Sequence, residues 1–265
     1  FTFVMAPMVH WPEVMVTYDI TDKILFSADA FGSFGAINGN LFDDEVNFEE
    51  KISEYRRYYT NIVGKYAPQT TLLLNKAKTL DVELVCPLHG LLLKRNISQI
   101  IELYTHWASY SPESQSVLIA YSSVYGNTKN AAEILATKLS QQGVKNIKMF
   151  DVSFTHHSYI LAEAFRCSHI VIATTTYNNC VFVNMSHFIE DILRHNLKHR
   201  TYAIIENGSW IPNCSDTIAA NLTKLRPSTI LENKIALKSS VKDINVDELD
   251  VLARDIAQDM LKLEI

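Results

Sequence analysis

The order of hydrophobic and polar positions changes character near residue 110. Before that point, short runs of β-branched and aromatic residues alternate with stretches whose apolar residues recur at helical spacing. These patterns predict four strands and three helices, with Asn96 as the candidate N-cap of the last helix. The predicted order is strand 1–5, strand 14–18, strand 24–27, helix 47–65, helix 69–80, strand 82–86 and helix 96–107.

The second part of the chain has a regular alternation of apolar strands and amphipathic helices. Five strands in about 150 residues, separated mostly by helices, indicate βαβ units and a parallel sheet. A doubly wound domain, with helices on both faces of the sheet, is the fold that this pattern favours. The predicted strands are 117–121, 147–152, 169–175, 201–205 and 233–238, and the predicted helices are 128–142, 184–195, 215–225 and 246–262.

A polar stretch separates the two patterns. Residues 109–116 are rich in serine, contain Pro112 and show no periodicity, which is typical of a linker. The sequence therefore predicts two α/β domains, at 1–110 and 116–265.

Composition excludes several classes of protein. The chain has 265 residues, of which 48% are hydrophobic and 20% charged, as in ordinary globular proteins. The net charge of −5 and the absence of a basic cluster argue against nucleic-acid binding. No apolar run approaches the roughly 18 residues that span a bilayer. Four cysteines are too few for a disulfide framework, so we expect reduced thiols and a cytoplasmic protein.

The first strand–helix turn of the second part is a candidate phosphate loop. Residues 122–128 contain two serines, a threonine and Gly126, follow a buried strand and precede a helix. Backbone N–H groups at a helix N-terminus bind phosphate, and hydroxyls add donors. The loop has no Walker lysine and no G-x-G-x-x-G pattern, which argues against NTPases and dinucleotide folds. A Ser/Thr-capped helix without any ligand is the alternative.

Two later loops, 174–179 and 206–210, follow the third and fourth strands of the second part and place aromatic rings beside amides or hydroxyls. In open α/β sheets, ligands bind at the carboxyl ends of the strands. With all three loops in this order, residues 116–265 resemble a flavodoxin, and the resemblance implies FMN binding. The implied cofactor-binding residues are Ser122, Ser123, Val124, Tyr125, Gly126, Asn127, Thr128, Thr175, Thr176, Tyr177, Asn178, Asn179, Asn207, Gly208, Ser209 and Trp210.

Three residues of the first part are candidate metal ligands. His10, Asp29 and His89 each lie at a predicted strand end or in the adjoining loop. Two imidazoles and a carboxylate suit zinc or iron. Their wide separation makes the spacing weak evidence, and taken singly each histidine is more often structural. Tyr55, Tyr58 and Tyr59 are interpreted as a helix-packing face.

The order of these motifs, followed by a flavodoxin-like domain, resembles the flavodiiron proteins, which join a metallo-β-lactamase-like domain to a flavodoxin domain. The resemblance implies that His10 and His89 each ligate one iron and that Asp29 bridges both. It also implies electron transfer from a rubredoxin-like or flavin-reductase donor through FMN to a diiron site that reduces O2 to water or NO to N2O. A head-to-tail homodimer is implied as well.

The sequence departs from that family at one point. The family's H-x-E-x-D-H ligand motif is not found, and three residues cannot satisfy two irons. We therefore expect a chain truncated at its N-terminus, a partner chain that supplies the rest, or a vestigial metal site. The alternative function is an FMN electron carrier whose first domain only docks or scaffolds.

Overall fold

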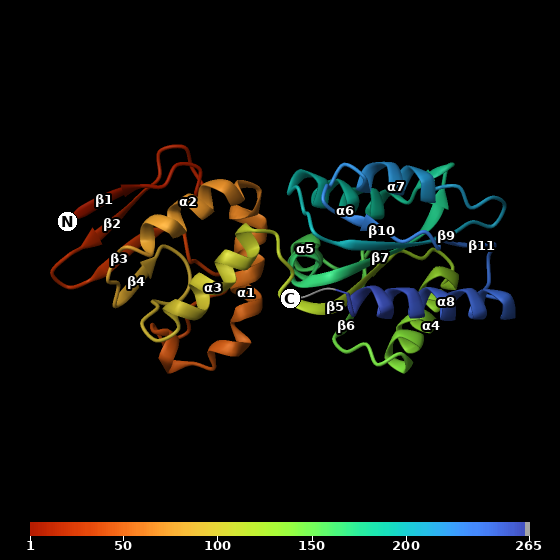
Figure 1. Cartoon of the computed structure of the whole chain (residues 1–265), viewed down its shortest axis with the longest axis horizontal. Coiled ribbons are helices and arrows are strands. Elements are labelled where there is room, and N and C mark those ends of the chain that lie inside the picture. Colours follow the sequence, from red (N-terminus) through yellow and green to blue (C-terminus); the bar gives the residue numbers. More distant parts are fainter. Residues whose placement is uncertain (263–265) are drawn as a thin grey trace. The chain divides into compact units, whose positions relative to one another are not determined.

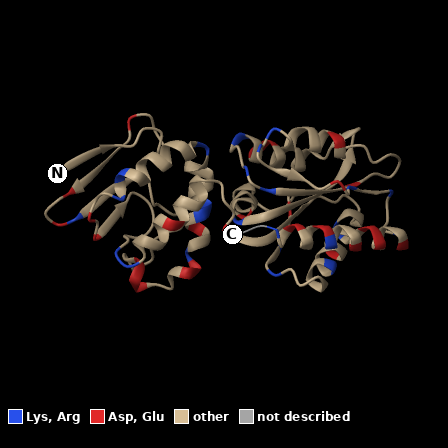
Figure 2. Ribbon diagram, in the orientation of Figure 1, with Lys and Arg blue, Asp and Glu red and all other residues tan. Residues whose placement is uncertain are grey.

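The computed structural model describes residues 1–262. The chain divides into two compact units, Phe1–Ser111 and Pro112–Ile265, which are coloured red to yellow and yellow-green to blue in Figure 1. The division falls inside the stretch predicted as a linker. Lysine, arginine, aspartate and glutamate residues are scattered over the ribbons of both units without a continuous basic stripe (Figure 2). Over residues 1–262, no helix combines the length and the apolar character that crossing a membrane requires.

The first unit is a four-stranded sheet with helices, in the strand order β1-β2-β3-β4. The first two pairings are antiparallel and the last is parallel. Short 3-10 turns lie at Asp43–Glu45, Phe48–Glu50 and Gly64–Tyr66. The strands and α-helices are β1 (Thr2–Met5), β2 (Met15–Asp19), β3 (Ile24–Ala28), α1 (Ile52–Tyr58), α2 (Ala67–Ala77), β4 (Leu84–Pro87) and α3 (Ile97–Ala108).

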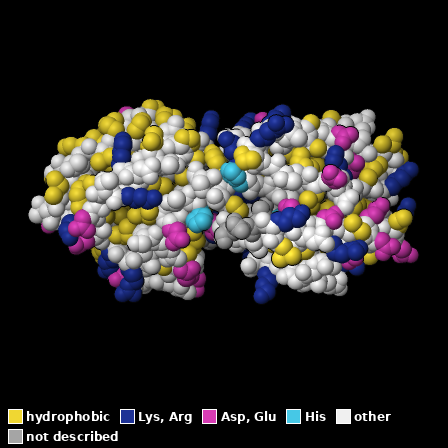
Figure 3. Space-filling view, viewed as in Figure 1, with side chains coloured by type: hydrophobic (Ala, Val, Ile, Leu, Met, Phe, Trp, Pro, Cys, Tyr) yellow, Lys and Arg dark blue, Asp and Glu magenta, His cyan; other side chains and the backbone are white. Residues whose placement is uncertain are grey.

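The sheet of the first unit has one buried and one exposed side. Side chains such as Leu25 and Val85 are buried and line a cavity together with residues of α2 and α3. Phe26 lies between the buried residues Leu25 and Ser27 and is itself exposed, and Phe3 in β1 is exposed as well. The space-filling view in Figure 3 shows apolar side chains gathered on the surface of this unit.

Two predictions for the first unit were wrong. The single helix expected over 47–65 is broken, because α1 widens into a π-helical turn at Tyr59–Val63 before α2 begins. Pro68, which has no N–H to donate, lies in the first turn of α2, where its missing donor costs nothing. Asn96 does not cap α3 with its side chain, because that amide donates instead to the fully buried carboxylate of Asp43 at 2.9 Å.

The second unit is a parallel sheet in the order β6-β5-β7-β9-β10, with β11 also paired to β9. A short strand, β8 (Cys180–Val181), pairs antiparallel with the end of β7. The other elements are β5 (Ser114–Tyr121), α4 (Asn127–Gln141), β6 (Ile147–Asp151), α5 (His157–Arg166), β7 (Cys167–Tyr177), α6 (Val183–Arg194), β9 (Thr201–Asn207), α7 (Ser215–Leu222), β10 (Thr229–Ile230), β11 (Ile235–Leu237) and α8 (Asp243–Met260).

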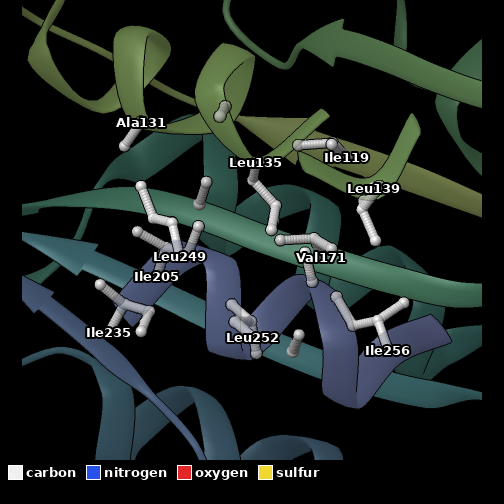
Figure 4. Packing of buried hydrophobic residues seen from close by; sticks show 14 of the residues in the cluster. Ile119, Ala131, Leu135, Leu139, Val171, Ile205, Ile235, Leu249, Leu252 and Ile256 are labelled. Carbon is white, nitrogen blue, oxygen red and sulfur yellow. The ribbon is translucent and has the colours of Figure 1, made fainter. Parts of the chain in front are cut away.

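Helices cover both faces of this sheet. Helices α4 and α8 pack on one face, and α5, α6 and α7 pack on the other (Figure 1). The α4–α8 layer closes a core of aliphatic side chains from the three central strands and both helices. Figure 4 shows Ile119, Val171, Ile205, Leu135, Leu139, Leu249, Leu252 and Ile256 meeting in this layer. The doubly wound α/β fold predicted from the sequence is confirmed.

The sequence missed several features of this unit. Helix α5 and the short strands β8 and β10 were not predicted, whereas the strand predicted at 233–238 is present as β11. Residues 114–116, predicted as linker, are instead the start of β5. Ser114 pairs with Cys167, and the N–H of Ser116 donates to the Ser168 hydroxyl at 3.2 Å. Polar residues can therefore occupy this strand because neighbouring side chains satisfy their hydrogen bonds.

A buried polar network ties α8 to the sheet. His169 in β7 is 1% exposed, and its ring nitrogens lie 2.9 Å from Ser168 Oγ and 3.2 Å from Asp259 Oδ2 in α8. Thr201 donates to the same Asp259 oxygen at 2.9 Å. Burial lowers the pKa of His169 below its ordinary value of 6.5, although Asp259 opposes the shift.

We predict that His169 makes the protein less stable as the pH falls below 6.5. The unfolded chain binds a proton at the ordinary pKa of histidine, whereas buried His169 in the folded protein binds it only at lower pH. The free energy of unfolding therefore keeps the contribution of neutral His169 above pH 6.5 and loses it as the pH falls below that value. The slope is at most about 1.4 kcal/mol per pH unit. Urea midpoints of the wild type and His169→Gln between pH 7.5 and 5 measure it. His106→Gln, in the first unit, should keep the wild-type slope, and an unchanged slope in His169→Gln would contradict the prediction.

Candidate functional site

The carboxyl ends of three strands of the second unit lie at one edge of the sheet. Tyr121 in β5 is in register with Ala173 in β7, which is in register with Ile205 in β9. Because the strands are parallel, the loops that follow them leave the sheet at that same edge. Strands β5 and β7 are also where the strand order reverses, with β6 on the other side of β5, and this is the position where doubly wound sheets bind ligands.

The loop between β5 and α4 contains an unsatisfied polar group. Ser123 Oγ is buried and has no hydrogen-bond partner among the described residues. Helix α4 follows directly, and its N-cap residue Gly126 contributes no side-chain bond to the first N–H groups. Thr128, in the first turn, is 2% exposed. A hydroxyl and free amides at a helix N-terminus together fit a phosphate group.

Ser122 has a different role from its neighbour. Its hydroxyl lies 2.8 Å from Thr174 Oγ1, and its carbonyl accepts a hydrogen bond from Thr175 Oγ1 at 3.3 Å. Ser122, Thr174 and Thr175 therefore join the ends of β5 and β7 to each other. Of the two serines, Ser123 is the one whose hydroxyl is left for a ligand.

The two other loops present aromatic rings. Tyr177 at the end of β7 is 48% exposed, and Trp210 after β9 is 89% exposed. Asn178 and Asn179 both have positive φ and form the two-residue turn between Tyr177 and Cys180, as type I′ hairpins require. The turn fixes where Tyr177 leaves the sheet, and exposed rings of this kind can stack on a flat heteroaromatic ligand.

Other predicted cofactor residues are engaged within the protein. The amide of Asn207 donates to Ser239 O at 2.9 Å and accepts from Ser239 N at 3.0 Å. Thr176 Oγ1 accepts a hydrogen bond from Asn213 N at 3.2 Å. These side chains hold the loops in place. Val124, Tyr125, Asn127 and Ser209 are exposed or partly exposed at the same edge of the sheet, Tyr125 at 83%.

The candidate metal ligands of the first unit lie together. His10 Nε2 is 3.6 Å from Asp29 Oδ2, and His89 Nε2 is 3.3 Å from Asp29 Oδ1. Each imidazole thus approaches a different oxygen of one carboxylate, as suits a carboxylate that bridges two metal ions. These donors fit a part of a two-metal centre. Within residues 1–262, no group of three or more His, Cys, Asp or Glu residues is arranged to hold a metal ion.

A tyrosine that the sequence assigned to packing also contacts this site. Tyr58 OH donates to Asp29 Oδ1 at 3.2 Å, and its ring lies 5.7 Å from that of His89. Burial, together with the charge and hydrogen bond of Asp29, raises the pKa of Tyr58, so the hydroxyl stays protonated and donates. Helical spacing identified the buried face correctly, but no local signal shows that α1 lies beside Asp29.

The backbone around Asp29 and His89 is unusual. Ala28 and Phe31 have positive φ on either side of Asp29, a conformation that costs energy for residues with a Cβ. Gly90 has φ +86°, and a Cβ there would lie 2.1 Å from Ser33 Oγ. The loop that carries His89 therefore depends on glycine at this position, both for its backbone angle and for its packing.

Comparison with known proteins agrees with this arrangement. Residues 1–90 match the family described as ODP family beta lactamase. The anaerobic nitric oxide reductase flavorubredoxin of Vibrio vulnificus is 33% identical over 229 residues, which are 83% of this chain and 45% of that protein. The chain thus spans about half the length of the curated relatives it matches.

Solved structures share the fold of nearly the whole chain. Rubredoxin oxygen:oxidoreductase from Desulfovibrio gigas aligns with a TM-score of 0.91 at 24% identity, over 98% of this chain and 65% of that one. The flavodiiron protein of Giardia intestinalis aligns with a TM-score of 0.92 at 20% identity, over 98% and 64% of the two chains. At these identities the likeness is one of fold.

The two units and their loops therefore have the fold of the flavodiiron proteins, with a β-lactamase-like unit followed by a flavodoxin-like unit. The chain is related in sequence to flavorubredoxin and in fold to the flavodiiron proteins. The resemblance inferred from the order of the motifs is confirmed.

We predict that Gly90→Ala disturbs the His89 loop well beyond the ordinary cost of alanine at positive φ. That cost is about 1–2 kcal/mol, and the collision with Ser33 adds to it, for a total of roughly 3 kcal/mol or more. The matched control is Gly39→Ala, since Gly39 also has positive φ but a Cβ there would meet nothing within 4 Å. Urea unfolding of both variants measures the difference. Equal destabilisation by the two substitutions would show that the contact with Ser33 is unimportant.

Proposed function

We propose that the second unit binds FMN at the carboxyl edge of its sheet. The observation that carries the proposal is the buried, unpartnered Ser123 hydroxyl at the N-terminus of α4, beside two loops with exposed aromatic rings. A phosphate monoester would satisfy Ser123 and the free amides of α4 without needing a lysine. When bound, FMN supplies electron-transfer chemistry.

The chain's own residues have separate tasks in this proposal. Ser123, Thr128 and the first amides of α4 hold the phosphate. Tyr177 and Trp210 supply apolar faces for the ring and exclude water from it. The hydrogen bonds of Thr175, Thr176 and Asn207 keep the three loops in fixed positions, so little order has to be gained on binding.

For the whole protein we propose reduction of O2 to water or of NO to N2O at a diiron site. This reaction is supported by the names of the relatives and by the positions of His10 and His89 beside the two oxygens of Asp29. The imidazoles would each hold one iron, and Asp29 would bridge them, while Tyr58 orients the carboxylate. The remaining ligands would come from polypeptide outside these residues.

The partners belong to the proposal too. Electrons would come from a rubredoxin-like or flavin-reductase donor, and a head-to-tail homodimer would bring flavin and metal together. We include a cytoplasmic location, supported by four cysteines that form no disulfide.

A second candidate function is that of an FMN electron carrier, in which the first unit docks or scaffolds and binds no metal. It is favoured by the donor set around Asp29, which among residues 1–262 consists of two imidazoles and one carboxylate.

We predict that FMN binds with quenching of its fluorescence, and that Ser123→Ala raises the Kd about five- to tenfold. The reason is the loss of a hydrogen bond worth about 1–1.5 kcal/mol to the phosphate. Fluorescence titration of the purified protein measures the Kd, and riboflavin, which lacks the phosphate, should bind both proteins equally. Ser140→Ala, at an exposed position of α4, is the control. A protein that ignores FMN would refute the proposal.

Iron binding separates the two candidate functions. Under the flavodiiron proposal, the protein as it exists in its source should hold about two irons per chain and consume NO or O2 when supplied with reductant. Asp29→Asn should lower the iron content, because the bridging charge is lost. A yellow protein with reversible flavin reduction but no iron and no gas consumption would favour the electron carrier.

A further inference from the structure

The buried carboxylate of Glu206 lies at the start of the loop that carries Trp210. It is the second-last residue of β9, is 6% exposed and lies in register with Thr174 of β7. Its Oε2 accepts hydrogen bonds from Cys214 N at 2.7 Å and Ser215 N at 2.8 Å. Its Oε1 accepts from Ser215 Oγ at 3.0 Å. One side chain thus joins the end of β9 to the beginning of α7.

This connection closes the loop between residues 207 and 214. The loop is held at other points as well, since Gly208 N donates to Leu237 O at 3.1 Å and Asn213 N donates to Thr176 Oγ1. A Cβ at Gly208 would lie 2.8 Å from Ile211 O, which shows how tightly the chain folds back. Trp210, at the tip, has 89% of its surface exposed.

The carboxylate has no cationic partner. Within residues 1–262, Glu206 makes no ion pair with lysine or arginine, and its hydrogen bonds come from two amides and a hydroxyl. The N-terminal end of α7 favours its negative charge. Burial, and to a lesser degree the charge of Glu206, raises the pKa of the Cys214 thiol to about 11.

We infer that Glu206 is a positioning residue that fixes the Trp210 loop over the flavin ring and makes reduction of the bound flavin harder by its negative charge. This inference rests on the proposed FMN site. Two-electron, one-proton reduction of the ring, with electrons from the donor protein, adds one negative charge. The negative charge of Glu206, at the start of the loop that flanks the ring, disfavours the negative charge that reduction adds to the flavin.

Substitution of Glu206 by glutamine separates the effect of the charge from that of the positioning, because glutamine can form the same hydrogen bonds. In Glu206→Gln, the amide oxygen can accept from Cys214 N and Ser215 N, and the amide nitrogen can donate to Ser215 Oγ. The three hydrogen bonds are preserved and only the charge is removed. Glu206→Ala removes the charge and the bonds together.

The first measurement is the binding of oxidised and fully reduced FMN to each variant, with the potential of the bound flavin. For Glu206→Gln we expect the Kd of oxidised FMN within about twofold of the wild type. The ratio of the two dissociation constants should move about tenfold toward the reduced form, which equals about +30 mV for a two-electron couple. Glu190→Gln, on the exposed surface of α6, is the charge-removal control and should leave the ratio unchanged.

The second measurement is hydrogen exchange of residues 207–214 without FMN. Protection should be kept in Glu206→Gln and lost in Glu206→Ala, and the latter should also weaken oxidised FMN binding tenfold or more. An unchanged Kd ratio in Glu206→Gln would overturn the electrostatic role. Wild-type exchange in Glu206→Ala would overturn the positioning role. Failure of the wild type to bind FMN would refute the proposed function and the electrostatic role with it, whereas the exchange data would still decide the positioning.

Discussion

The parallel register of β5, β7 and β9 is the constraint on which the second unit depends. With Tyr121, Ala173 and Ile205 side by side, the three following loops open at one edge of the sheet. The aliphatic layer between the sheet and helices α4 and α8 holds this register, because a shift of one residue would turn its buried side chains to the opposite face. Hydrophobic packing far from the loops thereby sets the dimensions of the candidate flavin site.

Polar side chains then determine how rigid that edge is. Ser122 joins β5 to β7, Asn207 joins β9 to the segment before α8, and Glu206 joins β9 to α7. Each of these groups is buried and has its hydrogen bonds within the protein. Ser123 is the exception, and a buried hydroxyl without a partner is costly unless a ligand satisfies it. The contrast between satisfied and unsatisfied groups separates the framework from the binding residues.

In the first unit, backbone conformation and close packing hold the candidate metal ligands in place. Asp29 is held between residues with positive φ, and His89 depends on the close approach of Gly90 to Ser33. Tyr58 is fixed to the same carboxylate from α1. Residues from three separate parts of the chain thus meet at one carboxylate, with both imidazoles on its oxygens. The geometry supports a shared metal-binding task, and it supplies only part of the ligands that two irons need.

Hydrophobic periodicity was sufficient to predict most strands and helices of the chain, because the alternating pattern of the second unit is strong. It failed where tertiary contacts override local pattern. The helix expected over 47–65 is broken ahead of Pro68, and the polar start of β5 is stabilised by Ser168. Helix α5 was overlooked, and the amide of Asn96 was taken by Asp43, which lies more than fifty residues away in sequence.

By itself, the sequence determined the class of fold, the order of the motifs and the residue types available at each loop. The tertiary structure decided which of these residues act together. Local pattern cannot tell Ser122 from Ser123, nor a packing tyrosine from one bonded to Asp29, because both distinctions depend on partners from other elements. The same holds for Glu206, whose hydrogen-bond donors become neighbours only when the loop after β9 turns back to begin α7.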